Sequence, residues 1–187
     1  MKKKLVFLIS VLIILAFAIS GTLAYFTDEV VAHNVITTGN VALQVSLDGA
    51  GETIPVMPGS KVERPLEIIA TEGTAQAFIR VKYDVVFLDA AGEIMPHTPE
   101  EIEAVLLIDE DTANWTEKDG WWYYGGTIGD GEKTGPLYRE IAFSGENMDN
   151  DYQGCTIRVT VTAQGVQKAN NGDSALEAAG WPEVSAN

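Results

Sequence analysis

The chain has 187 residues and a formal net charge of −15, which suits a single acidic domain. So much negative charge excludes binding to nucleic acid or to anionic lipid headgroups through the surface field. With one cysteine, Cys155, the chain cannot form an intrachain disulfide, and the alternating strand pattern around this residue favours a buried free thiol.

The first 24 residues have the three parts of a secretory signal peptide. Lys2–Lys4 are basic, residues 5–19 are apolar apart from one serine, and Ser20-Gly21-Thr22-Leu23-Ala24 follows, ending in a small residue. Thr22 and Ala24 occupy the −3 and −1 positions of a cut that would leave Tyr25 as the first residue. The sequence therefore predicts export, with residues 1–24 as the signal peptide.

An uncleaved membrane anchor is the alternative, because the apolar run approaches the roughly 20 residues that span a bilayer core. The polar break at residues 20–22 favours cleavage over anchoring. Cleavage leaves 163 residues with a charge of −18, since the first 24 carry three lysines and no acid. The expected protein is secreted and touches the membrane only before it is cut.

Residues 25–39 are unusual for the start of a mature domain. Tyr25 and Phe26 are exposed aromatics, and two pairs of β-prone residues follow without a helical stripe. We expect this segment to be either the first strand of the domain or an extended arm.

The pattern of residues 40–187 predicts a series of short strands separated by turns that contain Gly, Pro and Asp. The predicted strands cover residues 40–47, 61–70, 75–89, 115–116, 120–128, 137–143 and 155–165. Thr98, Pro99 and Glu101 form a capping box that starts a short helix ending near Leu107, and residues 173–179 are a candidate for one or two further helical turns. The pattern predicts an all-β fold, a β-sandwich or jelly roll with one or two short helices.

No catalytic, metal or cofactor site is predicted. The two histidines, His33 and His97, belong to no zinc-protease helix motif and to no recognisable Ser/His/Asp set, and both are expected at the surface. Residues 109–111 and 149–151 are acidic clusters that could supply oxygen ligands to calcium, but solvated loops are the favoured interpretation.

The run Trp121-Trp122-Tyr123-Tyr124 is the densest aromatic stretch. In a strand it sends alternate rings to opposite faces. Packing against the core and a neighbouring edge is favoured over a stacking platform for sugar.

Several motifs, in order, resemble the TasA/camelysin (CalY)-like family of SipW-dependent exported proteins. The N-terminal motif is Leu23-Ala24-Tyr25-Phe26-Thr27-Asp28, followed by Asn34 and Thr38-Gly39-Asn40-Val41. Later stretches that carry the resemblance are Met57–Ser60, Ala77–Val81, Gly120–Tyr124 and Val159–Gln167.

The resemblance implies a jelly-roll subunit of extracellular biofilm-matrix fibres from Gram-positive bacteria, released by a SipW-type signal peptidase. In such fibres an N-terminal strand of one subunit completes a sheet of the next, so the expected partners are copies of this chain or a related fibre subunit. The anchors of the donated arm would be Tyr25, Phe26, Val30, Val31, Val35 and Ile36.

Two alternatives stay open. The chain could be a monomeric cell-surface binding module for glycan or calcium, using Trp122 and Tyr124 or the acidic loops. Some relatives carry a metallopeptidase label, but without a recognisable zinc motif this third hypothesis has the least support, and we expect no enzyme.

Overall fold

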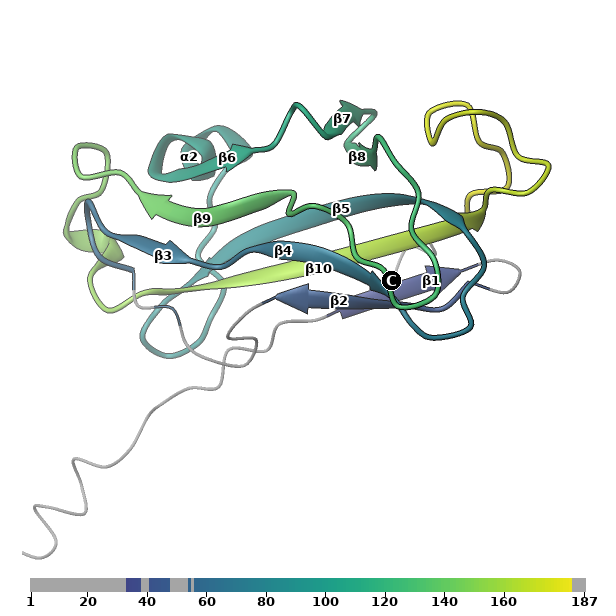
Figure 1. Ribbon diagram of the computed structural model, residues 1–187. Coiled ribbons are helices and arrows are strands. Elements are labelled where there is room, and N and C mark those ends of the chain that lie inside the picture. The colour runs from purple at the N-terminus through teal and green to yellow at the C-terminus, as the bar shows by residue number, and fades with distance from the viewer. Residues whose placement is uncertain (1–32, 38–40, 48–53, 55, 183–187) are drawn as a thin grey trace, which may run out of the picture.

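The computed structural model describes residues 33–37, 41–47, 54 and 56–182, which form β-sheets stacked as a sandwich (Figure 1). The larger sheet has the strand order β1-β10-β5-β8-β7. Its members are β1 (His33–Thr37), β5 (Ala77–Leu88), β7 (Trp115–Lys118), β8 (Trp121–Tyr124) and β10 (Thr156–Gln167). The all-β prediction is confirmed.

The second layer consists of a two-stranded sheet, β2-β4, and a three-stranded sheet, β3-β9-β6. Its members are β2 (Leu43–Leu47), β3 (Lys61–Glu63), β4 (Leu66–Ala70), β6 (Leu106–Glu110) and β9 (Tyr138–Phe143). Residues 132–137 run along β4, where the N–H of Thr134 donates to the carbonyl of Ile68 and the N–H of Leu137 to that of Leu66. This segment continues into β9, so the two small sheets form one layer.

The core fills the space between the layers. Alternate residues of β5 and β10 point inward and lose nearly all contact with water, as the period-two pattern predicted. The fully buried members include Ile79, Val81, Phe87, Ile157, Val161 and Ala163. Cys155, directly before β10, is a buried free thiol, which confirms its predicted role.

One predicted helix is confirmed, and the second candidate is reduced to a single turn closed on the Ser174 carbonyl. The helix α2 (Pro99–Val105) begins at the Thr98 capping box and ends before Leu107, because Leu106 already belongs to β6. The Ser174 turn lies within residues 173–179, whereas the 3-10 helix η1 (Asn150–Tyr152) forms where only a polar loop was expected. Asp149 caps η1 by accepting from the N–H of Asp151.

The aromatic hairpin and β9 differ in detail from the prediction. The β7–β8 turn lies at Asp119-Gly120, where both residues have positive φ, rather than at residues 117–119. Leu137 and Tyr138 are both buried, so strict alternation fails there. A register shift between β6 and β9 at Ile108 and Glu110 explains the failure, because a bulge changes which face successive residues occupy.

The segment after β10 folds back over the outer face of the larger sheet. Ala175 and Ala178 pack with Phe78 and Tyr123 of that face. The Arg80 guanidinium lies 4.3 Å from the centroid of Trp121 and 4.7 Å from that of Trp181. One end of this outer face is therefore covered by the chain itself.

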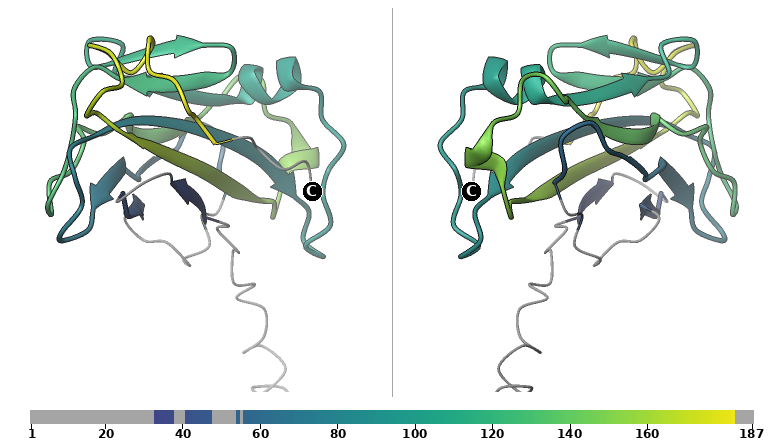
Figure 2. Two further views of the ribbon diagram at one scale, coloured as in Figure 1. Left: turned by 90° about the vertical axis from the view of Figure 1, so that its right-hand side faces the viewer. Right: turned by 90° about the vertical axis from the view of Figure 1, so that its left-hand side faces the viewer.

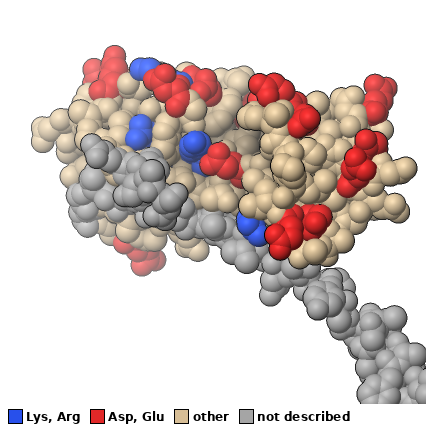
Figure 3. Space-filling view, turned by 180° about the vertical axis from the view of Figure 1, so that it is seen from behind, with Lys and Arg blue, Asp and Glu red and all other residues tan. Residues whose placement is uncertain are grey.

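The two sides of the sandwich carry different elements. The end views of Figure 2 place β1 and β2 at the bottom and α2 with the β7–β8 hairpin at the top. Acidic side chains outnumber basic ones on the face shown in Figure 3, in keeping with 27 acids against 12 bases in the whole chain.

A glycine controls how closely β2 approaches the larger sheet. A Cβ at Gly165 of β10 would lie 2.9 Å from side-chain methyls of both Val41 and Leu43. We expect Gly165→Ala to lower the free energy of unfolding by roughly 1–3 kcal/mol, as overpacking does, in urea titrations. Gly135→Ala is the matched control, because a Cβ there meets nothing within 4 Å; equal loss in both variants would contradict this account.

Candidate assembly interface

The N-terminal strand is attached to the domain in an unusual way. β1 pairs in parallel with β10, with register from His33↔Val161 to Thr37↔Gly165. Every other strand pair in the described part of the chain is antiparallel. Residues 33–37 thus belong to a first strand, one of the two alternatives expected for residues 25–39.

Only part of the predicted arm and none of the predicted cleavage site can be located. Val35 and Ile36 lie in β1, opposite Ala163 and Gln164 of β10. The other predicted anchors and cleavage residues lie outside the described residues: Thr22, Ala24, Tyr25, Phe26, Val30 and Val31.

The chain is fixed to the domain again just after β1. Thr74 Oγ1 donates to the carbonyl of Ala42 at 3.0 Å, and the N–H of Thr71 donates to the same carbonyl at 2.9 Å. Val41 beside it is buried in the core. These contacts involve no residue of β1, so they hold the start of β2 wherever β1 pairs.

β1 lies at the edge of the larger sheet. It is an edge strand of five residues with one neighbour, β10. Parallel pairs are slightly less stable per residue than antiparallel ones. Exchange of β1 would therefore leave the other strand pairs of the larger sheet intact.

A cleft of about 1010 Å³ lies between β5 and β6. These strands are on the side of the sandwich opposite β1 (Figure 1). The lining of the cleft includes Val85, Ile102, Leu107 and Trp122. The Tyr83 hydroxyl donates to Glu110 Oε1 and links the two strands. Burial, and then the bonded Glu110 carboxylate, raise the pKa of Tyr83 far above its usual value.

The aromatic run is divided between environments. Trp121 and Tyr123 face the outer cluster, whereas Trp122 and Tyr124 pack against the core, as the packing interpretation predicted. Tyr124 lies against Trp115 with centroids 5.0 Å apart. Trp122 lines the cleft and Tyr124 does not, so the two rings do not form one open platform.

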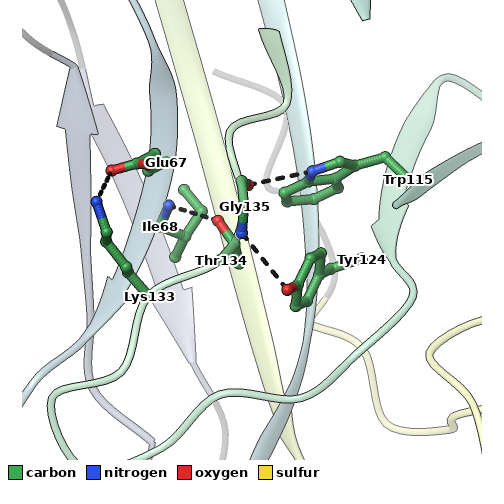
Figure 4. Close-up of polar contacts among 7 residues, drawn as sticks. All are labelled: Glu67, Ile68, Trp115, Tyr124, Lys133, Thr134 and Gly135. Carbon is green, nitrogen blue, oxygen red and sulfur yellow. Dashed lines mark hydrogen bonds and ion pairs between the residues drawn. The ribbon is translucent and has the colours of Figure 1, made fainter. Parts of the chain in front are cut away.

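Figure 4 shows how the loop before β9 connects the two layers. Thr134 Oγ1 accepts from the N–H of Ile68, while the Gly135 N–H donates to the Tyr124 hydroxyl and its carbonyl accepts from Trp115 Nε1. β4 of one layer is thereby joined to β7 and β8 of the other. No sequence pattern had singled out this loop, because its partners come from three separate elements.

The expected surface sites have local structural roles. The His97 side chain is only 16% exposed and its ring stacks on Tyr152 at 5.3 Å, so it is not the surface residue expected, while His33 begins β1. Asp111 accepts from Asn114 Nδ2 at 2.7 Å, and this hydrogen bond holds the pKa of the Asp111 carboxyl below its usual value.

Within the described ranges, no group of three or more His, Cys, Asp or Glu side chains is placed to hold a metal ion. The helices among those residues include none long and apolar enough to cross a membrane. Comparison with known proteins finds no family model, no curated protein and no solved structure that matches this chain.

The loop contact gives a stability prediction. Thr134 is 2% exposed, so Thr134→Val leaves the N–H of Ile68 buried without its acceptor. We expect a loss of about 1–3 kcal/mol in the free energy of unfolding, measured by chemical denaturation. Thr160→Val on β10 is the isosteric control, and a matching loss there would show that the hydrogen bond is not the cause.

The Tyr83 phenol gives a pH prediction. Its pKa is raised in the folded state, whereas in the unfolded chain it ionises at about 10. Its contribution to stability is therefore complete below about pH 10 and declines as the pH rises further. We expect the free energy of unfolding, measured by urea titration, to fall less steeply with rising alkaline pH in Tyr83→Phe than in the parent. Identical dependence on pH in the two proteins would contradict the assignment.

Proposed function

We propose that this protein is an exported, non-enzymatic structural subunit of extracellular biofilm-matrix fibres, and that its sandwich has jelly-roll topology. A SipW-type signal peptidase would cut after Ala24, and the freed N-terminal strand would then pair with a neighbouring subunit. The single observation that carries the proposal is the parallel edge strand β1 at the start of the described domain.

The acceptor in this proposal is the β10 edge of the next subunit. Two copies of the chain present the same β10 residues, so an exchanged β1 can form the same five residue pairs between molecules that it forms within one. Exchange of an identical element is a low-cost route to association, and a head-to-tail exchange that does not close builds a filament. Val35 and Ile36 would lie within the exchanged ladder.

Cleavage would control assembly by releasing the strand. Before the cut, residues 25–32 connect β1 to a membrane-inserted leader, which prevents the strand from reaching another subunit. After the cut, the Ala42 contacts keep the donor attached to its own domain. One strand then links two folded domains without unfolding either of them.

A second function keeps some support from the cleft between β5 and β6. Trp122 lines that cleft, and an aromatic ring there could stack on a sugar, which supports a cell-surface module that binds glycan. The metallopeptidase hypothesis gains no support, because the sequence contains no recognisable zinc motif.

A pair of cysteines tests the strand exchange. The test uses mature chain in which Cys155→Ser removes the native thiol and Val35→Cys and Ala163→Cys add a new pair. Residues 35 and 163 are Cα partners in the β1–β10 register. Oxidation of the monomer closes an intrachain disulfide that keeps β1 paired with its own β10. We therefore expect no filaments by electron microscopy until a reductant is added. Oxidation of preformed filaments should give interchain disulfides, visible as a ladder on a denaturing gel.

Val35→Cys with Thr160→Cys is the control, because Thr160 lies three residues out of register. This pair should cross-link poorly in both states. Filaments that form equally well from the oxidised, locked Val35/Ala163 variant would contradict strand donation.

A further inference from the structure

One edge of β5 is only partly paired. β10 covers the whole of its other edge, from Ala77 to Leu88. On the free side, β8 pairs with Arg80 and Val81 alone, and the next bond is the one from the N–H of Met95 to the carbonyl of Phe87. Between Val81 and Phe87 no strand of the described chain lies against this edge.

Strand geometry shows which groups are left over. In an antiparallel sheet, each residue directs both its N–H and its C=O to one edge of the strand, and the next residue directs both to the other edge. Ala77 exchanges both hydrogen bonds with Ile128 on the free side, and Phe87 accepts there, so the odd-numbered residues face that side. The backbone groups of Tyr83 and Val85 therefore point toward the cleft without a hydrogen-bond partner among the described residues.

The surroundings suit an additional strand. The opposite wall is β6, whose one neighbour in the sheet is β9. Leu107 on that wall is 51% exposed, and Ile102 and Trp122 are partly buried beside it. An extended segment in the cleft could form hydrogen bonds with the backbone N–H and C=O groups of Tyr83 and Val85. Every second side chain of that segment could then cover the apolar side chains of the wall.

Charge decides what kind of segment fits. The charged lining consists of Asp84, Glu103, Asp109, Glu110, Glu140 and Lys61. The one lysine bonds to Glu140, so the remaining field is negative. The chain's own residues 25–39 contain Asp28 and Glu29 and no lysine or arginine, which makes another copy's N-terminal strand a poor occupant.

We propose that the β5 edge at Tyr83–Val85 binds a basic, extended segment of a different protein. The segment adds as a strand to β5, places alternate apolar side chains on Leu107 and Trp122, and brings lysine or arginine to Glu103 and Asp109. This surface lies on the side of the sandwich opposite β1 (Figures 1 and 2), so it is separate from the β10 edge. It would connect the protein to a second component whether or not the chain forms fibres.

Synthetic seven-residue peptides test the proposal on the mature protein. The probe alternates lysine and valine; the comparison peptides replace lysine with glutamate or carry N-methyl groups on alternate valines. We expect calorimetry at low ionic strength to show binding of the first peptide at least about tenfold tighter than either of the others. On binding, the amide hydrogens of Tyr83 and Val85 should exchange more slowly.

Two charge variants locate the site. Glu103→Lys with Asp109→Lys should weaken the lysine peptide by about tenfold or more, whereas Glu72→Lys with Asp173→Lys changes the net charge equally, away from the cleft, and should have little effect. Equal weakening by both pairs would overturn the proposal, because binding would then follow overall charge. Undiminished binding of the N-methylated peptide would also overturn the proposal, because backbone hydrogen bonds would then not be needed. So would a protein that binds chito-oligosaccharide in the cleft but does not bind the lysine peptide.

Discussion

The pairing of β5 with β10 is the constraint on which the rest of the structure depends. Twelve consecutive residue pairs join the two strands, from Ala77↔Gln167 to Leu88↔Thr156. Their inner faces supply many of the fully buried side chains, and their outer face supports the C-terminal segment. Since the paired residues are far apart in the chain, the ladder also fixes where every intervening element must pack.

The two outer edges of this ladder are covered to different degrees. The β10 edge is covered by β1 over five residues, while the β5 edge is covered by β8 at one end and by Met95 at the other. An uncovered edge invites pairing with another chain, and proteins commonly limit such pairing with charge. Here the acids around the β5 cleft repel an equally acidic copy, whereas β1 fits an identical β10 edge by register.

Local sequence patterns predicted the parts of this arrangement that local physics determines. Alternation located β5 and β10, and the Thr98 capping box located the start of α2. The Asp119-Gly120 pair was a type I′ turn signal that should have placed the hairpin turn, because both residues readily adopt positive φ. The alternation at Leu137 and Tyr138 failed for a non-local reason, the register shift against β6.

The candidate interfaces could not be predicted from sequence because they depend on which strands become neighbours. Nothing within residues 33–37 indicates that they pair in parallel with residues more than a hundred positions later. Similarly, Tyr83 and Val85 lie in the strongest predicted strand, and their edge is open only because β8 begins at Trp121 and turns away at Gly120. The N-terminal motif drew attention to the right segment without giving its partner.

The position of the Ala42 contacts sets the geometry of any fibre built by exchange of β1. Three residues separate Thr37 from Val41, and an extended chain spans at most about 3.6 Å per residue, so Thr37, the last residue of a donated β1, stays close to its own domain. The accepting β10 edge must therefore approach the β1–β2 side of the donor. The β5 cleft, on the opposite side, is not used by that contact. In a fibre of this kind each subunit would present an acidic cleft, with the unpaired Tyr83 and Val85 backbone at its edge, and a basic partner could bind along the assembled filament.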